Sequence, residues 1–183
     1  MSRTVVLAAA ISLALAACTG NKPEAVTEDT SATTPATTPA AAENPLLVAS
    51  TLPFGAPVFD KIKDSDYLPA FEEGMKQHLA EMRKIADNPE PATFENTIEA
   101  QERTGETLNR VSRIFFGLVQ ADTNPQRQKI QEEIAPKLAA HQDEIALDPK
   151  LFARVKSVYD ARATLKLDPE QLRLVERDYQ ELV

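Results

Sequence analysis

The sequence is poor in residues that many fold and function classes depend on: it has one cysteine, five glycines and no tryptophan among 183 residues. A single cysteine excludes an internal disulfide framework, and scarce glycine favours helices over a loop-rich or all-β fold. Basic residues are also fewer than acidic ones: the chain has 20 Lys and Arg and 28 Asp and Glu, which gives a formal net charge of −8. This balance argues against a nucleic-acid partner, which needs clustered positive charge. The length suits one domain.

The one cysteine, Cys18, follows an apolar amino-terminal run. Residues 1–17 carry one early positive charge at Arg3 and then a stretch too short to span a membrane comfortably, which is the pattern of a signal peptide. The end of this run, Leu-Ala-Ala-Cys, resembles the bacterial lipobox, which implies lipidation of Cys18 and a membrane anchor. Because Thr19 is not aspartate, the resemblance further implies the outer membrane of a Gram-negative bacterium, facing the periplasm. The alternative is a chance cysteine in an ordinary signal or a core helix.

The segment after the signal has no helical or strand periodicity. Residues 18–44 are rich in Thr, Ala and Pro and lack aromatic side chains, so they cannot bury enough apolar surface to offset chain entropy. We interpret them as a flexible, disordered tether. The folded domain is predicted over residues 45–183. It begins with an extended arm, residues 45–60, whose prolines oppose a helix and whose Leu, Phe and Val side chains are expected to pack against other parts of the protein.

Beyond the arm, apolar residues recur at spacings of three and four, which predicts an all-α fold of amphipathic helices. Three helix starts are marked by an Asx-Pro pair at Asn124, Asp148 and Asp168, where the side chain can cap free amides and proline occupies the first helical turn. Pro136 is expected to kink its helix or to end it early. The predicted helices cover residues 66–87, 93–121, 125–147, 149–165 and 169–183.

The only two histidines, His78 and His141, each precede a glutamate by three residues, Glu81 and Glu144. Positions i and i+3 share a helix face, so the spacing raises the question of a metal site divided between two helices. Both histidines also lie on apolar stripes, which is typical of packing residues whose ring nitrogens find a polar partner. A zinc site needs three or four protein ligands, and no further ligands complete a set. We therefore predict no metal and no cofactor in this chain.

Motifs of other active sites are absent from the sequence. It contains no H-E-x-x-H, no glycine-rich phosphate loop and no G-x-S-x-G. No catalytic residue is assigned, and whether the chain is itself an enzyme stays open.

Two long segments, residues 52–88 and 92–124, resemble the amino-terminal region of the thimet oligopeptidase family of zinc metallopeptidases, and most closely its bacterial peptidyl-dipeptidase branch, the dipeptidyl carboxypeptidases. The resemblance is clearest in the strings YLPAFE at 67–72 and TFENTI at 93–98 and in residues 134–155. The resemblance implies an all-α enzyme with a deep channel, a zinc ion and release of dipeptides from the carboxyl ends of short peptides. The family's H-E-x-x-H zinc motif has no counterpart here, so no family site residue is carried over and the chain alone is predicted inactive.

Two functions remain open at this point. In the first, the chain is an incomplete amino-terminal fragment of a lipid-anchored zinc peptidyl-dipeptidase, whose helices wall the substrate channel and whose partner is the missing carboxyl-terminal catalytic half. The isolated fragment would then expose apolar surface. In the alternative, the chain is a stand-alone helical lipoprotein that acts as a non-catalytic binding module.

Overall fold

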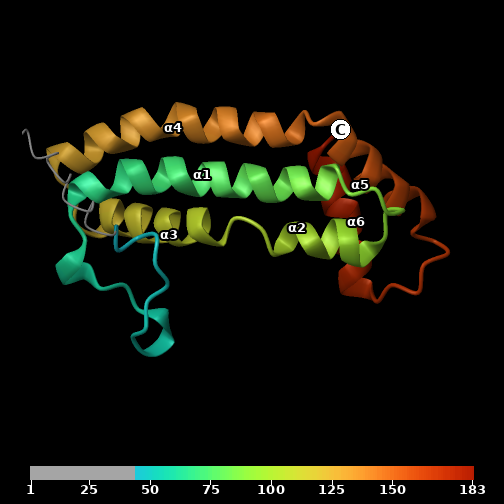
Figure 1. The fold of residues 1–183 in the computed structure, drawn as a ribbon, viewed down its shortest axis with the longest axis horizontal. Coiled ribbons are helices and arrows are strands. Elements are labelled where there is room, and N and C mark those ends of the chain that lie inside the picture. Colours follow the sequence, from blue (N-terminus) through green and yellow to red (C-terminus); the bar gives the residue numbers. More distant parts are fainter. Residues whose placement is uncertain (1–43) are drawn as a thin grey trace, which may run out of the picture. The chain divides into compact units, whose positions relative to one another are not determined.

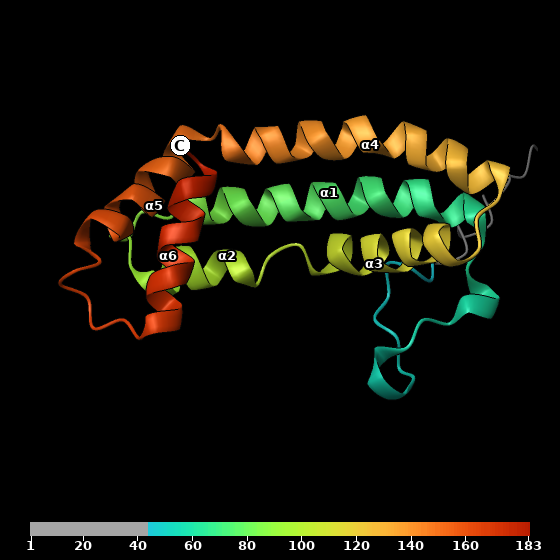
Figure 2. The same ribbon diagram turned by 180° about the vertical axis from the view of Figure 1, so that it is seen from behind.

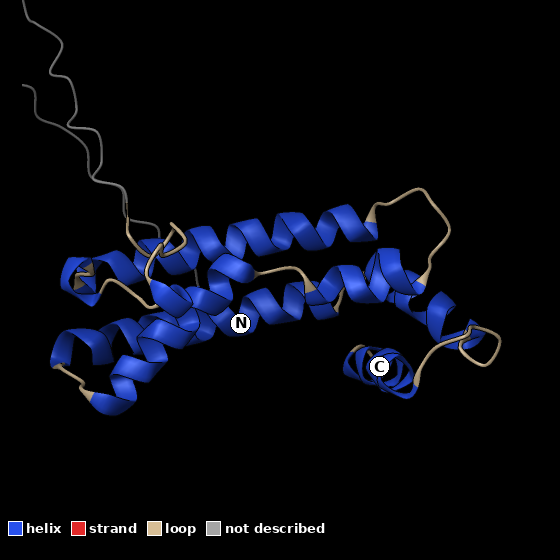
Figure 3. Ribbon diagram, turned by 90° about the horizontal axis from the view of Figure 1, so that it is seen from below, coloured by secondary structure: helices blue, strands red, loops and turns tan. Residues whose placement is uncertain are grey.

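The computed structural model describes residues 44–183, and within that range every regular element is helical. Figure 3 shows helices joined by loops and no strand in the described part of the chain. The all-α prediction is therefore confirmed. The predicted signal peptide, Cys18 and the tether up to residue 43 lie outside the described residues. No helix among the described residues is long and apolar enough to cross a membrane.

Three long helices run side by side (Figures 1 and 2). They are α1 (Asp64–Ala86), α3 (Glu106–Ala121) and α4 (Pro125–Ala146), and α1 contacts both of the others. Near the carboxyl-terminal end of α1, the short π-helix η3 (Phe94–Glu99) continues into α2 (Ala100–Glu102). It packs with α5 (Pro149–Ala161) and α6 (Pro169–Glu181). We refer to residues 64–181 as the helical body.

The Asx-Pro starts behave as predicted. The side chain of Asn124 accepts a hydrogen bond from the Arg127 amide, and the side chains of Asp148 and Asp168 each accept from two amides of the first turn. The predicted carboxyl-terminal ends of the helices are less accurate, because α5 ends at Ala161 and not at 165, and α6 ends at Glu181 and not at 183. Of the two outcomes expected at Pro136, an early end does not occur, since α4 continues to Ala146, one residue short of the predicted end at 147. Helix α1 begins at Asp64, two residues before the predicted start, and the Asp66 carboxylate accepts a hydrogen bond from the Lys63 amide at 2.8 Å.

The predicted continuous helix 93–121 is interrupted. Residues 103–105 form a turn in which Gly105 has a φ of 71°, a conformation that favours glycine. A β-carbon at Gly105 would lie 3.2 Å from the His78 ring, so glycine also permits close contact with α1. Helical periodicity continues through this turn, which is why the sequence pattern concealed the break.

The body has two apolar cores along α1. The first is aromatic: Phe115 lies with its ring centroid 5.0 Å from Tyr67 and 5.4 Å from Phe71, and all three side chains are fully buried. Gly74 brings α3 close to α1, because a β-carbon there would lie 3.0 Å from the Leu108 Cα. The second core, where α5 and α6 pack, is mainly aliphatic and includes Ile98, Leu151, Val155, Val158 and Val175.

A buried arginine joins α5 to the chain between α1 and η3. Arg154 donates hydrogen bonds to the carbonyls of Asn88 and Glu90, both at 2.8 Å, and to the side chains of Asn96 and Thr97. These bonds fix the 88–97 connection against α5. The burial of this arginine was not predicted from the sequence.

The arm, residues 45–60, extends beyond α3 in both views (Figures 1 and 2). Its root packs on the body, where Leu46 is buried and Arg110 donates to the carbonyls of Leu46 and Leu47 at 3.2 Å. The expectation that its apolar side chains all pack inward is wrong for Val48, Leu52, Phe54 and Phe59, which are exposed.

Candidate functional site

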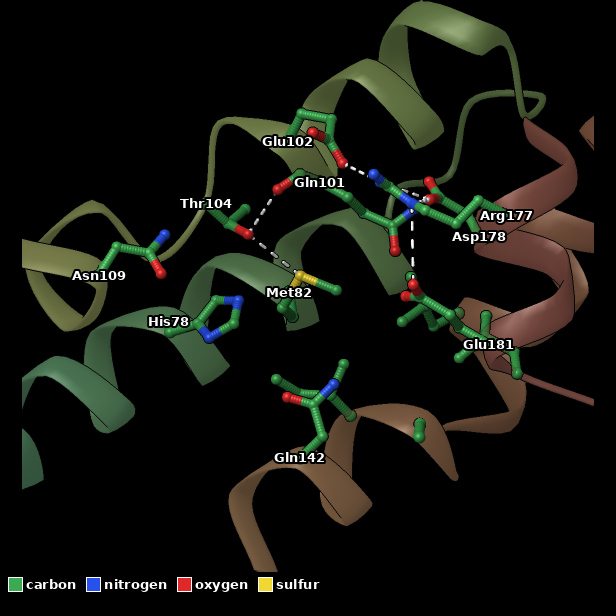
Figure 4. Close-up of a pocket in the computed structure, with 14 residues that line it drawn as sticks. His78, Met82, Gln101, Glu102, Thr104, Asn109, Gln142, Arg177, Asp178 and Glu181 are labelled. Carbon is green, nitrogen blue, oxygen red and sulfur yellow. Dashed lines mark hydrogen bonds and ion pairs between the residues drawn. The ribbon is translucent and has the colours of Figure 1, made fainter. Parts of the chain in front are cut away.

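A pocket of about 300 Å³ lies where α1, the 103–105 turn, α4 and α6 meet (Figure 4). Three side-chain amides, a hydroxyl, an imidazole and a buried carboxylate line it, together with the apolar side chains of Met82 and Ile145. These polar residues are Gln101, Asn109, Gln142, Thr104, His78 and Asp178, and the charged side chains of Glu102, Arg177 and Glu181 also line the pocket.

The two histidines meet at the edge of this pocket. Nδ1 of His78 in α1 lies 3.0 Å from Nε2 of His141 in α4, a hydrogen bond in which one ring donates and the other accepts. His141 is 8% exposed, and the ring centroids are 5.0 Å apart. Each histidine therefore finds its polar partner in the other, which the sequence did not predict.

Neither glutamate of the two His-x-x-Glu pairs joins the imidazoles. Oε2 of Glu81 accepts the Gly105 amide at 2.8 Å, and Oε1 of Glu144 forms an ion pair with Arg83 at 2.7 Å. Glu81 thus stabilises the turn between α2 and α3, and Glu144 joins α4 to α1. Within residues 44–183 no cluster of three or more metal-ligating side chains exists. The divided-metal-site hypothesis is not supported by this geometry.

Burial governs the protonation of the histidine pair. Desolvation lowers the pKa of His78, and the neighbouring His141 lowers it further, while Glu81 opposes the shift. Burial likewise lowers the pKa of His141 against the opposing effect of Glu144. The pair is therefore neutral near pH 7 and shares a single hydrogen between the two facing nitrogens.

The α6 side of the pocket carries an ion cluster (Figure 4). Arg177 binds Glu102 at 2.5 Å and Asp178 at 2.9 Å, and Glu181 lies at 3.7 Å. Asp178 is 7% exposed, and its Oδ2 has no hydrogen-bond partner among the described residues. Burial raises the pKa of its carboxyl group. Asp178 was not predicted from the sequence, although its position three residues after Val175 places it on the apolar face of α6.

The ionisable side chains around the pocket bond mainly to one another. Their arrangement therefore joins the helices and offers polar groups to a ligand, but it presents no reactive group. Thr104 donates to the Gln101 carbonyl at 2.7 Å and lies against Met82, which orders the turn. No nucleophile–base pair and no complete metal-ligand set is present in the described residues. Cys18, the one predicted modification site, lies outside them.

Comparison with known proteins identifies relatives for most of the chain. Over 140 residues, 76% of this chain, the sequence is 47% identical to dipeptidyl carboxypeptidase from Escherichia coli K12, and 44% identical to dipeptidyl carboxypeptidase from Salmonella typhimurium LT2. The chain is similar to dipeptidyl carboxypeptidases. It spans about a fifth of the length of these curated relatives, since the match covers 21% of each. No protein-family model matches the chain.

Proposed function

We propose that this chain is the amino-terminal helical part of a lipid-anchored zinc peptidyl-dipeptidase of the thimet oligopeptidase type. The whole enzyme would release dipeptides from the carboxyl ends of short peptides. The observation that carries the proposal is the identity of 47% over 140 residues to an enzyme named dipeptidyl carboxypeptidase. Identity at this level, over that length, implies a shared fold in the matched stretch.

The catalytic chemistry would reside outside this chain. His78 and His141 bond to each other, and Glu81 and Glu144 bond to groups other than the imidazoles. Because a catalytic zinc takes three protein ligands with supporting contacts, residues 44–183 do not fit a zinc site. Zinc would belong to the carboxyl-terminal catalytic half, which most of each relative's length is available to supply.

The helical body would then wall the substrate channel. Helix α1 packs against both α3 and α4, and these helices would form one side of that channel. A narrow channel would exclude folded proteins by size and admit short peptides. Lipidation of Cys18 would hold the enzyme at a membrane, which we propose is the periplasmic face of the outer membrane.

A stand-alone helical lipoprotein with a binding role is the second candidate. It is favoured by one observation: the two cores of the body are closed by residues of this chain, with Tyr67, Phe71, Phe115 and Val175 all nearly inaccessible. A body of this kind can be stable without further chain.

Functional complementation tests the first proposal. The 183-residue chain is mixed with Escherichia coli dipeptidyl carboxypeptidase from which the stretch matched by this chain has been deleted, and dipeptide release from a short peptide is measured with and without a chelator. We expect no release by either piece and zinc-dependent release by the mixture. An inactive mixture whose pieces do not associate would contradict the proposal, as would zinc-dependent release by the chain alone.

A further inference from the structure

The arm presents apolar side chains that nothing in the described structure covers. Phe54 is completely exposed, and Phe59, Val48 and Leu52 are 53%, 46% and 44% exposed. The other large exposed apolar residues of the described chain, Leu147, Leu165 and Val183, are scattered along its carboxyl-terminal part. Scattered apolar residues are normal on a surface, whereas a group of them on one projecting segment marks an interaction site.

The tip of the arm is held in a fixed and strained shape. Phe54 has a φ of 59° and Gly55 a φ of 66°, and a bulky side chain rarely occupies that left-handed region. Local hydrogen bonds maintain the turn: the Gly55 amide donates to the Leu52 carbonyl at 3.0 Å, and the Ser50 hydroxyl donates to the Ala56 carbonyl at 2.5 Å. The phenylalanine is thus presented outward by the backbone.

The root of the arm is equally well fixed. Asn44 donates to the Asp66 carbonyl at 2.8 Å, and Arg110 in α3 donates to the carbonyls of Leu46 and Leu47. Buried Leu46 anchors the same stretch in the aromatic core. An exposed aromatic on a segment ordered at both root and tip forms contacts with little entropy loss on binding.

We propose that Phe54 is the anchor by which this chain docks into an apolar pocket on the carboxyl-terminal catalytic part of the same enzyme, with Leu52 and Phe59 flanking it. This inference rests on the proposed function and specifies its interface. The matched stretch covers only 21% of each relative, so most of the relative's polypeptide is available to cover the arm. Aromatic side chains seated in pockets dominate the energetics of such interfaces.

The test measures affinity between the 183-residue chain and the Escherichia coli enzyme lacking the matched stretch, by sedimentation or fluorescence titration. Phe54→Ala is expected to weaken binding at least about tenfold, and Phe59→Ala by less. Leu147→Ala is the matched control, since Leu147 is 80% exposed and terminates α4 away from the arm; it should change the affinity by less than about twofold. Thermal melts check folding, which Phe54→Ala should preserve because the side chain contacts no core.

The outcomes separate the interface from the function. Association of the wild-type chain that Phe54→Ala leaves unchanged would overturn the docking inference and leave the proposed function standing. Failure of the wild-type chain to associate would contradict both. Self-association of the chain, or binding to phospholipid vesicles, that is lost in Phe54→Ala while affinity for the enzyme piece is unchanged would assign the arm to a second copy or to a membrane and overturn the proposal.

Discussion

Two phenylalanines show how the helical body differs from the arm. Phe115 is 0% exposed and packs edge-on against Phe71 in the aromatic core, whereas Phe54 is fully exposed on a turn with positive φ. The same residue type therefore stabilises the fold in one place and contributes no packing in the other. An apolar side chain that does not stabilise its own chain is available to a partner.

The difference extends to polar groups. In the body, Arg154 makes four hydrogen bonds in the interior and the two histidines satisfy each other. In the arm, hydrogen bonds from Arg110 hold the root to the body, and local hydrogen bonds hold the turn that displays Phe54. The body is stabilised by its own packing, whereas we propose that the arm presents its apolar side chains to a partner, and the following substitutions test that division.

The largest expected effect is at Phe115. Phe115→Ala should lower the free energy of unfolding by about 4 kcal/mol, because it leaves a cavity among Tyr67, Phe71 and Phe116. Urea denaturation followed by circular dichroism measures the change. A loss below about 1 kcal/mol would show that this core is loosely packed and would break the contrast with Phe54.

Arg154→Ala should cause the next largest loss in the free energy of unfolding. The substitution removes the donor to the carbonyls of Asn88 and Glu90 and to the buried hydroxyl of Thr97, and we expect the free energy of unfolding to fall by about 3 kcal/mol. Arg154→Lys should not restore it, because an ammonium cannot reach acceptors arranged around a planar guanidinium. The exposed Arg103→Ala is the control and should change stability by less than about 0.5 kcal/mol.

The histidine pair predicts a pH dependence confined to the body. Since burial lowers the pKa of both rings in the folded state, the unfolded chain takes up protons first as the pH falls below about 6.5. Their contribution is fully present above that pH and is lost as the pH falls toward the lowered folded values. Urea midpoints measured from pH 7.5 to 5.5 should fall more steeply for the wild type than for the double variant His78→Gln, His141→Gln. Equal slopes would contradict the neutral buried pair.

The smallest expected effect is at Phe54. Phe54→Gly relieves the positive-φ strain but increases the entropy of the unfolded chain, so stability should change by less than about 0.5 kcal/mol. Urea denaturation under the conditions used for Phe115→Ala gives the direct comparison. A loss above about 2 kcal/mol would mean that the arm supports the body and would remove the basis of the docking proposal.

The sequence predicted most of the body because helix starts are local. Asn124, Asp148 and Asp168 cap the helices that their Asx-Pro pairs indicated. The break at Gly105 escaped prediction because helical periodicity continues through it, and the sequence does not show that the His78 ring lies against this glycine. The pairing of His78 with His141 escaped for the same reason, since spacing along a helix does not report which helices become neighbours. The exposure of Phe54 could not be predicted either, because a segment of prolines and apolar residues is equally typical of an arm that packs on the body and of one that is exposed.

The mass of the native protein tests the central claim most directly. Membranes of the organism that makes this chain are extracted with detergent and probed with an antibody raised against residues 60–120. We predict a band several-fold larger than the 20.1 kDa of this sequence, because the helical body would be continuous with a catalytic half. A lipid-bearing band near 20 kDa would contradict that account and would favour the stand-alone lipoprotein.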